Sequence, residues 1–226
     1  MFYGPSGILI MIIAVVLGTA TQGFVSSSFR RFSRAASRSG MTGAEVASRI
    51  LESEGLGDVA IEPVAGELTD HFDPRGNVLR LSGPVYGTPS IAAAGVAAHE
   101  AGHAVQHARG FVFARVRNAL VPAANIGSQA AFPLIFLGMF LRLGGLVDLG
   151  VWLFAAAVLF QIVTLPVEFD ASRRALVALN STGVLAEDEI GGARTVLTAA
   201  ALTYVASTLV AVLYLLQFIG LSRSND

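Results

Sequence analysis

The sequence predicts a mainly α, polytopic membrane protein with about four transmembrane helices and one small α+β domain. Three observations lead to this fold class. Of the 226 residues, 54% are hydrophobic and only 14% are charged, which is far from the usage of soluble proteins. Four long stretches contain no charged residue, and each can span a bilayer as a helix. One region, from about residue 40 to residue 117, has the mixed polar and apolar pattern of a folded soluble domain.

Residues 1–29 are uncharged and form the first predicted transmembrane helix. A cleaved signal peptide is the alternative, but it would carry positive charge before the apolar run. Here the arginines follow the run, at positions 30, 31, 34 and 38. Because arginines mark the cytoplasmic end of a span, we expect the N-terminus outside and the chain from residue 30 onward in the cytoplasm.

Residues 30–117 form the predicted cytoplasmic domain. Thr42-Gly-Ala-Glu45 reads as a capping box that begins a helix ending near residue 55. Residues 59–64 suit a short strand, and residues 67–72 and 77–82 suit a hairpin across Asp-Pro-Arg-Gly. Ser90 can cap a further helix over residues 91–108, which Arg109-Gly110 would end.

The stretch His-Glu-Ala-Gly-His, residues 99–103, carries the functional interpretation. On a helix, two histidines four positions apart are offset by only about 40° and about 6 Å along the axis, so both can bind one zinc ion. Glu100 then faces the metal-bound water, whose pKa a catalytic zinc lowers to about 7. The pattern predicts one Zn²⁺ ion, His99 and His103 as ligands, Glu100 as the catalytic residue, and peptide-bond hydrolysis in a zincin-like domain.

The strands before this helix predict how a peptide substrate binds. Metallopeptidases commonly bind substrate as an added strand, held by main-chain hydrogen bonds. The candidate edge is the strand that contains Val78, Leu79, Arg80 and Leu81, and an ordinary core strand is the open alternative. Asp70, His71 and Asp73 at the hairpin are candidates for metal ligands or for groups that support the ligands.

The C-terminal half of the chain supplies three further spans. Residues 118–167 form a predicted helical hairpin, with uncharged stretches at 118–141 and 149–167, and Pro122 and Pro133 suggest a kink in the first. Residues 168–194 form a polar cytoplasmic segment, and residues 195–226 form the last span and a short tail. The basic residues of the short loops fall almost entirely on one side, which favours a cell (inner) membrane, multi-pass protein with a cytoplasmic active site.

A third protein ligand must complete a catalytic zinc site, and Glu168 is the predicted one. No further histidine follows at metzincin spacing, because position 109 is Arg. Asp148 falls on the outer side, and the acids at 187–189 appear in a solvated polar loop. Pro166 suits the first turn of a new helical segment that would present Glu168 at the cytoplasmic surface. Asp170 is then expected to orient a ligand histidine, with His71 as a further candidate for this supporting role.

Composition excludes several other classes of site and partner. The chain has no cysteine, so the metal site must use histidines and carboxylates. All fifteen basic residues are Arg, the net charge is −1, and no basic stripe interleaves with aromatics, so no nucleic-acid partner is expected. The expected partners are the lipid bilayer and a peptide or protein substrate, membrane proteins included. His107 lies two turns beyond His99 and is expected to pack rather than to bind the same ion. Three residues are candidate oxyanion stabilisers: Arg173, Arg174 and Tyr86.

The motifs together resemble the YugP-like neutral zinc metallopeptidases, a family of bacterial membrane zinc proteases. The resemblance rests on AEVASRILESEGLGDV, TDHFDPRGNVLRLS, AAHEAGHAVQHA and LPVEFDASRRA, in that order. The chain is more distantly similar to HtpX-like and CAAX-prenyl membrane endopeptidases, which have a later E-x-x-x-D after H-E-x-x-H. Here Ser172 stands four residues after Glu168, so the supporting carboxylate of those enzymes has no match. The resemblance implies a membrane-anchored, gluzincin-like endopeptidase.

Two other functions compete with this interpretation. A site-2-type intramembrane protease would explain the apolar run before His99, but that run is too short to span a bilayer and no later Asp-Gly ligand motif follows. A non-catalytic membrane scaffold or chaperone with a vestigial zinc site is the other, and the intact Glu100 disfavours it.

Overall fold

The structure, a computed structural model, describes residues 5–223. The outermost residues of the first predicted span and of the C-terminal tail, 1–4 and 224–226, lie outside the described residues. The chain packs as two compact units. The helical unit comprises the chain up to Thr21, Val112–Pro166 and the chain from Leu202 on; the mixed unit comprises Gln22–Phe111 and Val167–Ala201.

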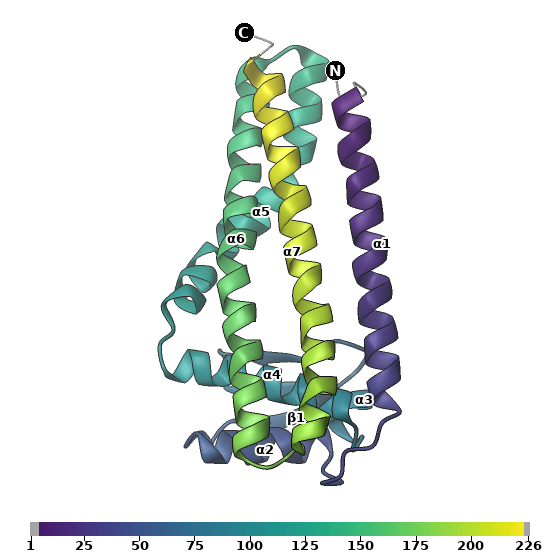
Figure 1. Cartoon of the computed structure of the whole chain (residues 1–226). Helices are drawn as coiled ribbons and strands as arrows, with labels where there is room; N and C mark the ends of the chain where they lie inside the picture. The colour runs from purple at the N-terminus through teal and green to yellow at the C-terminus, as the bar shows by residue number, and fades with distance from the viewer. Residues whose placement is uncertain (1–4, 224–226) are drawn as a thin grey trace. The chain divides into compact units, whose positions relative to one another are not determined.

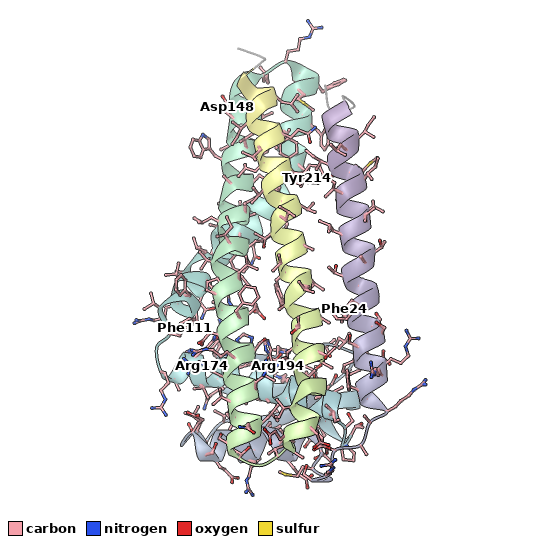
Figure 2. All side chains as sticks on the ribbon, viewed as in Figure 1. Phe24, Phe111, Asp148, Arg174, Arg194 and Tyr214 are labelled. Carbon is pink, nitrogen blue, oxygen red and sulfur yellow. The ribbon has the colours of Figure 1, made fainter. Side chains whose placement is uncertain are left out.

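Four helices among residues 5–223 are long and apolar enough to cross a membrane, which confirms the predicted fold class. They are α1 (Pro5–Ser33), α5 (Val112–Leu141), α6 (Gly144–Ser181) and α7 (Glu187–Arg223) (Figure 1). In the helical unit, the rings of Phe132, Phe154 and Phe218 pack edge to face in a core shared by α5, α6 and α7. Large apolar side chains such as Trp152 and Phe140 are exposed, as expected of helices solvated by lipid. Figure 2 shows carbon-rich side chains projecting from the long helices.

Two predictions for the segment 168–194 are wrong. Pro166 does not begin a new helix but lies inside α6, because a proline costs a helix only local hydrogen bonds, which membrane-type helices tolerate. The acids 187–189 do not lie in a solvated loop but form the first turn of α7, where they complement the helix dipole. Glu189 is buried and accepts hydrogen bonds from the backbone N–H groups of Ala186 and Arg38.

The mixed unit contains all three strands of the described chain and the helix with the histidine motif. Its helices are α2 (Gly43–Ser53), α3 (Gly83–Tyr86) and α4 (Ile91–Ala108), and its strands are β1 (Ala60–Val64), β2 (His71–Asp73) and β3 (Val78–Ser82). The predicted capping box is confirmed, because the side chains of Thr42 and Glu45 exchange hydrogen bonds with the backbone at the start of α2. The predicted cap of α4 is also confirmed, since the Ser90 hydroxyl accepts from the Ala93 N–H.

The strands form one sheet in the order β1-β3-β2. β3 pairs in parallel with β1 and antiparallel with β2, so the predicted hairpin is present with a first strand shorter than expected. The prediction that Val78, Leu79, Arg80 and Leu81 form an open edge is wrong, because β3 is the central strand. Alternating hydrophobicity could not reveal this, since it reports which face is buried and not which side is paired. The edges of the sheet are β1 and β2.

The core of the mixed unit joins these elements around α4. The apolar face of α2, with Ile50 and Leu51, packs on the small residues of α4, and Leu79 of β3 belongs to the same core. The opposite side of α4 lies against the end of α6 and the start of α7 (Figure 1), where Gly102 faces the backbone of Ala171. Small side chains on α4 allow this close approach, and it brings α6 beside the histidine motif.

Candidate metal centre

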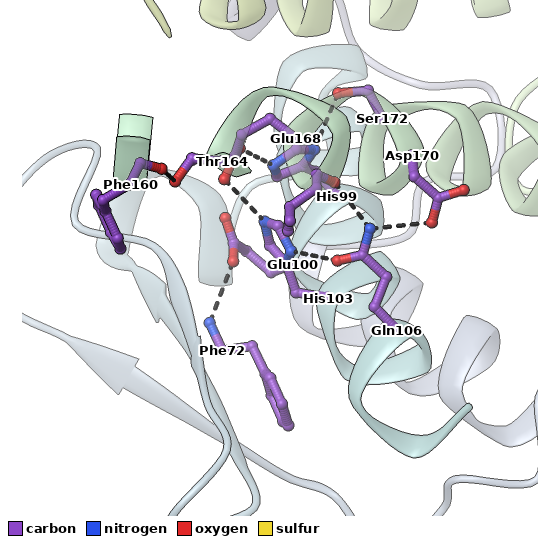
Figure 3. Close-up of polar contacts among 11 residues, drawn as sticks. Phe72, His99, Glu100, His103, Gln106, Phe160, Thr164, Glu168, Asp170 and Ser172 are labelled. Atoms are coloured by element: carbon purple, nitrogen blue, oxygen red, sulfur yellow. Dashed lines mark hydrogen bonds and ion pairs between the residues drawn. The ribbon is translucent and has the colours of Figure 1, made fainter. Parts of the chain in front are cut away.

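Two helices of the mixed unit supply one cluster of potential metal ligands. α4 presents His99 and His103 on one face, with ring centroids 4.7 Å apart, and α6 presents Glu168 opposite them. One nitrogen of each histidine and one carboxylate oxygen of Glu168 all lie within 4.8 Å of one another. All three side chains are largely buried. Figure 3 shows the three residues converging.

The donor set and its spacing fit zinc. Two imidazoles and one carboxylate are a ligand set of catalytic zinc sites, which keep a fourth position open. Ligand atoms about 2.0 Å from a tetrahedral zinc lie about 3.3 Å apart. The His99 Nε2 atom lies 3.3 Å from Glu168 Oε2, and the His103 Nε2 atom lies 3.8 Å from Glu168 Oε1. His99, His103 and Glu168 could therefore form a zinc site with little rearrangement.

The site favours positive charge. Burial alone would lower the pKa of His99, but the hydrogen bond to Glu168 and the charges of Glu100 and Glu168 outweigh it and raise this pKa. A raised histidine pKa in a buried position indicates a negative electrostatic potential at the ring. The same potential attracts a divalent cation, which agrees with the donor chemistry.

Glu100 lies beside the cluster but is not one of its three potential ligands. Its carboxylate accepts a hydrogen bond from the backbone N–H of Phe72 on β2, at 3.1 Å (Figure 3). Burial raises the pKa of the Glu100 carboxyl to about 7; the charges of Glu168 and Asp70 add to this, while His99 and the Phe72 N–H oppose it. A carboxyl with a pKa near neutrality can accept and return a proton.

The Nδ1 atom of each histidine in the cluster has its own partner. Ser172 Oγ lies 3.2 Å from His99 Nδ1, and Gln106 Oε1 lies 3.0 Å from His103 Nδ1. Ser172 occupies the position, four residues after Glu168, where the resembling endopeptidases have an aspartate. In this chain the Ser172 hydroxyl, rather than an aspartate carboxylate, contacts His99 from this position.

The role expected of Asp170 is wrong in one respect, because the carboxylate contacts Gln106 rather than a histidine. Asp170 Oδ2 accepts from Gln106 Nε2 at 3.0 Å, and Arg173 and Arg174 also donate to Asp170. Asp170 is therefore joined to His103 through Gln106. The two arginines, which were candidate oxyanion stabilisers, serve as partners of this carboxylate.

The other predicted residues are not part of the three-residue group. His71 is exposed and its Nδ1 atom bonds the Thr69 carbonyl, so the expectation that His71 supports a ligand is wrong. Asp70 accepts from Ser82, and Asp73 accepts from Arg80. His107 is exposed with its ring centroid 5.8 Å from that of Phe72, in agreement with a packing role. Tyr86 packs on the hydrophobic core.

Three contacts of the site were missed at the level of sequence: Gln106, Ser172 and the backbone of Phe72. Gln106 stands three residues after His103, one helical turn on, and this spacing was a usable signal. Ser172 stands at the aspartate position of E-x-x-x-D, which was noted as a departure but not assigned a contact. A backbone group leaves no trace in residue type, so the Phe72 contact had no signal.

Comparisons with known proteins agree with this geometry. The model of the family described as "Putative neutral zinc metallopeptidase" matches residues 7–223. The "Putative membrane protease YugP" of Bacillus subtilis (strain 168) is 48% identical over 213 residues, which cover 94% of each chain. The search of solved structures found no match. The length and identity of these matches show that the chain belongs to the neutral zinc metallopeptidase family.

Proposed function

We propose that this membrane protease is a gluzincin-like zinc endopeptidase that hydrolyses peptide bonds at the cytoplasmic face of the cell membrane. The observation that carries the proposal is the convergence of His99, His103 and Glu168, with Glu100 buried beside them. His99, His103 and Glu168 hold the zinc ion. Bound zinc supplies Lewis acidity, which lowers the pKa of a coordinated water and polarises the substrate carbonyl.

Glu100 serves as the general base in this proposal. It is adjacent to His99 in the chain and is not one of the three residues that could hold the ion, so its carboxylate is available for proton transfer. A buried carboxylate beside a metal-bound water can accept a proton from that water and later donate it to the leaving amine. In the protein without substrate, the Phe72 N–H holds one oxygen of the carboxylate.

The substrate adds to β2 rather than to the central strand β3. β1, the other edge, carries Pro63, which has no N–H to donate, and the acidic Glu62. β2 lies against α4, and the Phe72 N–H points away from β3 toward Glu100. An extended peptide that pairs with β2 would therefore run past Glu100. The peptide would also compete for the Phe72 N–H, and the Glu100 carboxylate would then be free to bond the metal-bound water.

Placement in the membrane follows from the arginines near the span ends. Ten of them fall on the side of the proposed domain 30–117 and the segment 168–194, and only Arg142 and Arg223 fall on the other. We place both segments in the cytoplasm. Single cysteines introduced at Gly57 and Glu187 should be labelled from the same, cytoplasmic side, because the native chain contains no cysteine. Labelling from opposite sides would contradict a shared site.

Glu100→Gln tests catalysis against the remaining alternatives. A zinc endopeptidase should lose casein cleavage by a factor of about 10² to 10⁴ while it retains zinc. A scaffold with a vestigial site would show zinc binding and no zinc-dependent cleavage in the wild type. Loss of zinc together with activity would instead make Glu100 a ligand. A site-2-type protease is disfavoured because α4 is not one of the candidate spans among residues 5–223, and it would cleave membrane-embedded peptides in preference to casein.

A further inference from the structure

Gln106 is the one fully buried glutamine among the described residues, and it contacts both helices that carry the cluster. Its side chain is 1% exposed. It bonds His103 on α4, and on α6 it bonds the Val167 carbonyl at 2.8 Å and the Asp170 carboxylate at 3.0 Å. Burial of a polar side chain without partners costs free energy, so these three bonds explain why Gln106 is tolerated there.

The partners on α6 fix the orientation of the amide. A backbone carbonyl and a carboxylate paired with two arginines can only accept hydrogen bonds. The group that faces Val167 and Asp170 must therefore be the NH₂ of Gln106, since a flipped amide would place two acceptors in contact on that side. The carbonyl oxygen Oε1 is left to face His103.

The orientation of the amide in turn fixes the imidazole. Because Oε1 has no hydrogen, the His103 Nδ1 atom must carry the proton that joins them. In the neutral ring the lone pair is then on Nε2, the nitrogen that faces Glu168 at 3.8 Å. His99 is less constrained, since the Ser172 hydroxyl can either donate or accept.

We propose that Gln106 is a positioning residue that holds His103 in the Nδ1–H tautomer, with its Nε2 lone pair directed at the metal position. The same side chain ties the ligand histidine of α4 to the residue directly before Glu168, so it also sets the distance between the ligands from the two helices. The inference rests on the proposed zinc function. It adds to that function the residue through which Asp170 and its arginines act on the site.

The test measures the zinc affinity of the full-length protein in detergent by chelator competition. Gln106→Met keeps the length of the side chain and removes its hydrogen bonds, and it should weaken zinc binding about 10- to 100-fold. The exposed Gln129→Met is the matched control and should leave the affinity unchanged. Ser172→Ala should have a smaller effect than Gln106→Met, because Ser172 does not impose a tautomer.

A second measurement separates positioning from general destabilisation. Nitrogen NMR of ¹⁵N-histidine-labelled, zinc-free protein at mildly alkaline pH should show His103 protonated at Nδ1 in the wild type and largely at Nε2 in Gln106→Met. Gln106→Glu should weaken zinc binding because its second oxygen faces Val167 and Asp170, and adding Asp170→Asn should restore part of the affinity by supplying an amide donor.

Wild-type affinity and an unchanged His103 tautomer in Gln106→Met would overturn the inference. This outcome differs from failure of the proposed function, in which the wild type itself would bind no zinc.

Discussion

The close contact at Gly102 gives a sharp prediction, because this glycine lies between the two histidines of α4 and faces α6. A Cβ atom at position 102 would lie 2.8 Å from the Ala171 carbonyl oxygen and 3.3 Å from the Ala171 Cα atom. Ordinary contacts begin at 3.4 Å, so the backbone of α6 would have to move by 3.4 − 2.8 = 0.6 Å in Gly102→Ala. Backbone atoms cannot rotate aside as a flexible side chain can.

A shift of this size is large for a metal site. Ala171 lies three residues after Glu168 on the same helix, so the ligand oxygen moves with it. Ligand distances at a zinc site are held within about 0.2 Å. Overpacking costs about 1–3 kcal/mol, so Gly102→Ala should weaken zinc binding about 5- to 150-fold, measured by chelator competition in detergent.

Gly95→Ala is the matched control. It lies two turns earlier on α4, where a Cβ atom would meet the Ala193 Cβ atom of α7 at 3.4 Å, an ordinary contact. It should bind zinc as the wild type does. Equal zinc affinities for Gly102→Ala and Gly95→Ala would refute the idea that this contact sets the ligand spacing.

Three further outcomes follow from the site. Phe72→Pro removes the N–H that donates a hydrogen bond to Glu100, and it spares the hydrogen bonds between β2 and β3. Its peptidase turnover should therefore be about 10-fold or more below that of Phe72→Ala, with equal zinc content. Equal turnover of the two variants would exclude a role for the N–H. His107 is exposed, so His107→Ala should retain stoichiometric zinc in metal analysis. Loss of zinc in this variant would make His107 a ligand. In zinc-free protein, burial raises the Glu100 pKa from 4.5 to about 7. Ionising Glu100 in the folded state therefore lowers the free energy of unfolding by about 3 kcal/mol. This loss is absent below pH 4.5, grows between pH 4.5 and about 7, and is complete above about pH 7. Glu100→Gln should remove this part of the decline in thermal stability in detergent, and an unchanged decline would contradict the burial argument.

Local sequence signals were sufficient for the elements that depend on nearby residues. The capping box at Thr42, the Ser90 cap and the spacing of His99 and His103 each act within one helical turn, so the sequence specifies them directly. Glu168 could be reached by elimination, since few acids follow the histidine motif. The approach of α6 to α4 depends on the Gly102–Ala171 contact, which no periodicity encodes.

The predictions that failed concern features that depend on contacts between residues far apart in the sequence. The alternation in β3 does not reveal how many neighbours the strand has, and pairing with β1 on one side and β2 on the other makes it central. Pro166 is a helix-starting residue by local preference, but α6 continues through it into the mixed unit. A glutamate is usually solvated, but Glu189 is buried and accepts a hydrogen bond from the N–H of Arg38, 151 positions away. His71 lies in β2, the strand whose Phe72 N–H contacts Glu100, but the His71 ring bonds the Thr69 carbonyl.

The most direct measurement is the zinc content of Glu168→Ala after dialysis, compared with the wild type and with Asp170→Ala, all purified in detergent and checked for folding. If His99, His103 and Glu168 hold the ion, the wild type should contain one zinc per chain, and Glu168→Ala should lose it while remaining folded. Asp170→Ala should retain zinc with weakened affinity, because Asp170 acts through Gln106. Stoichiometric zinc in Glu168→Ala, with loss in Asp170→Ala or His71→Ala, would contradict the assignment and move the third ligand to that residue.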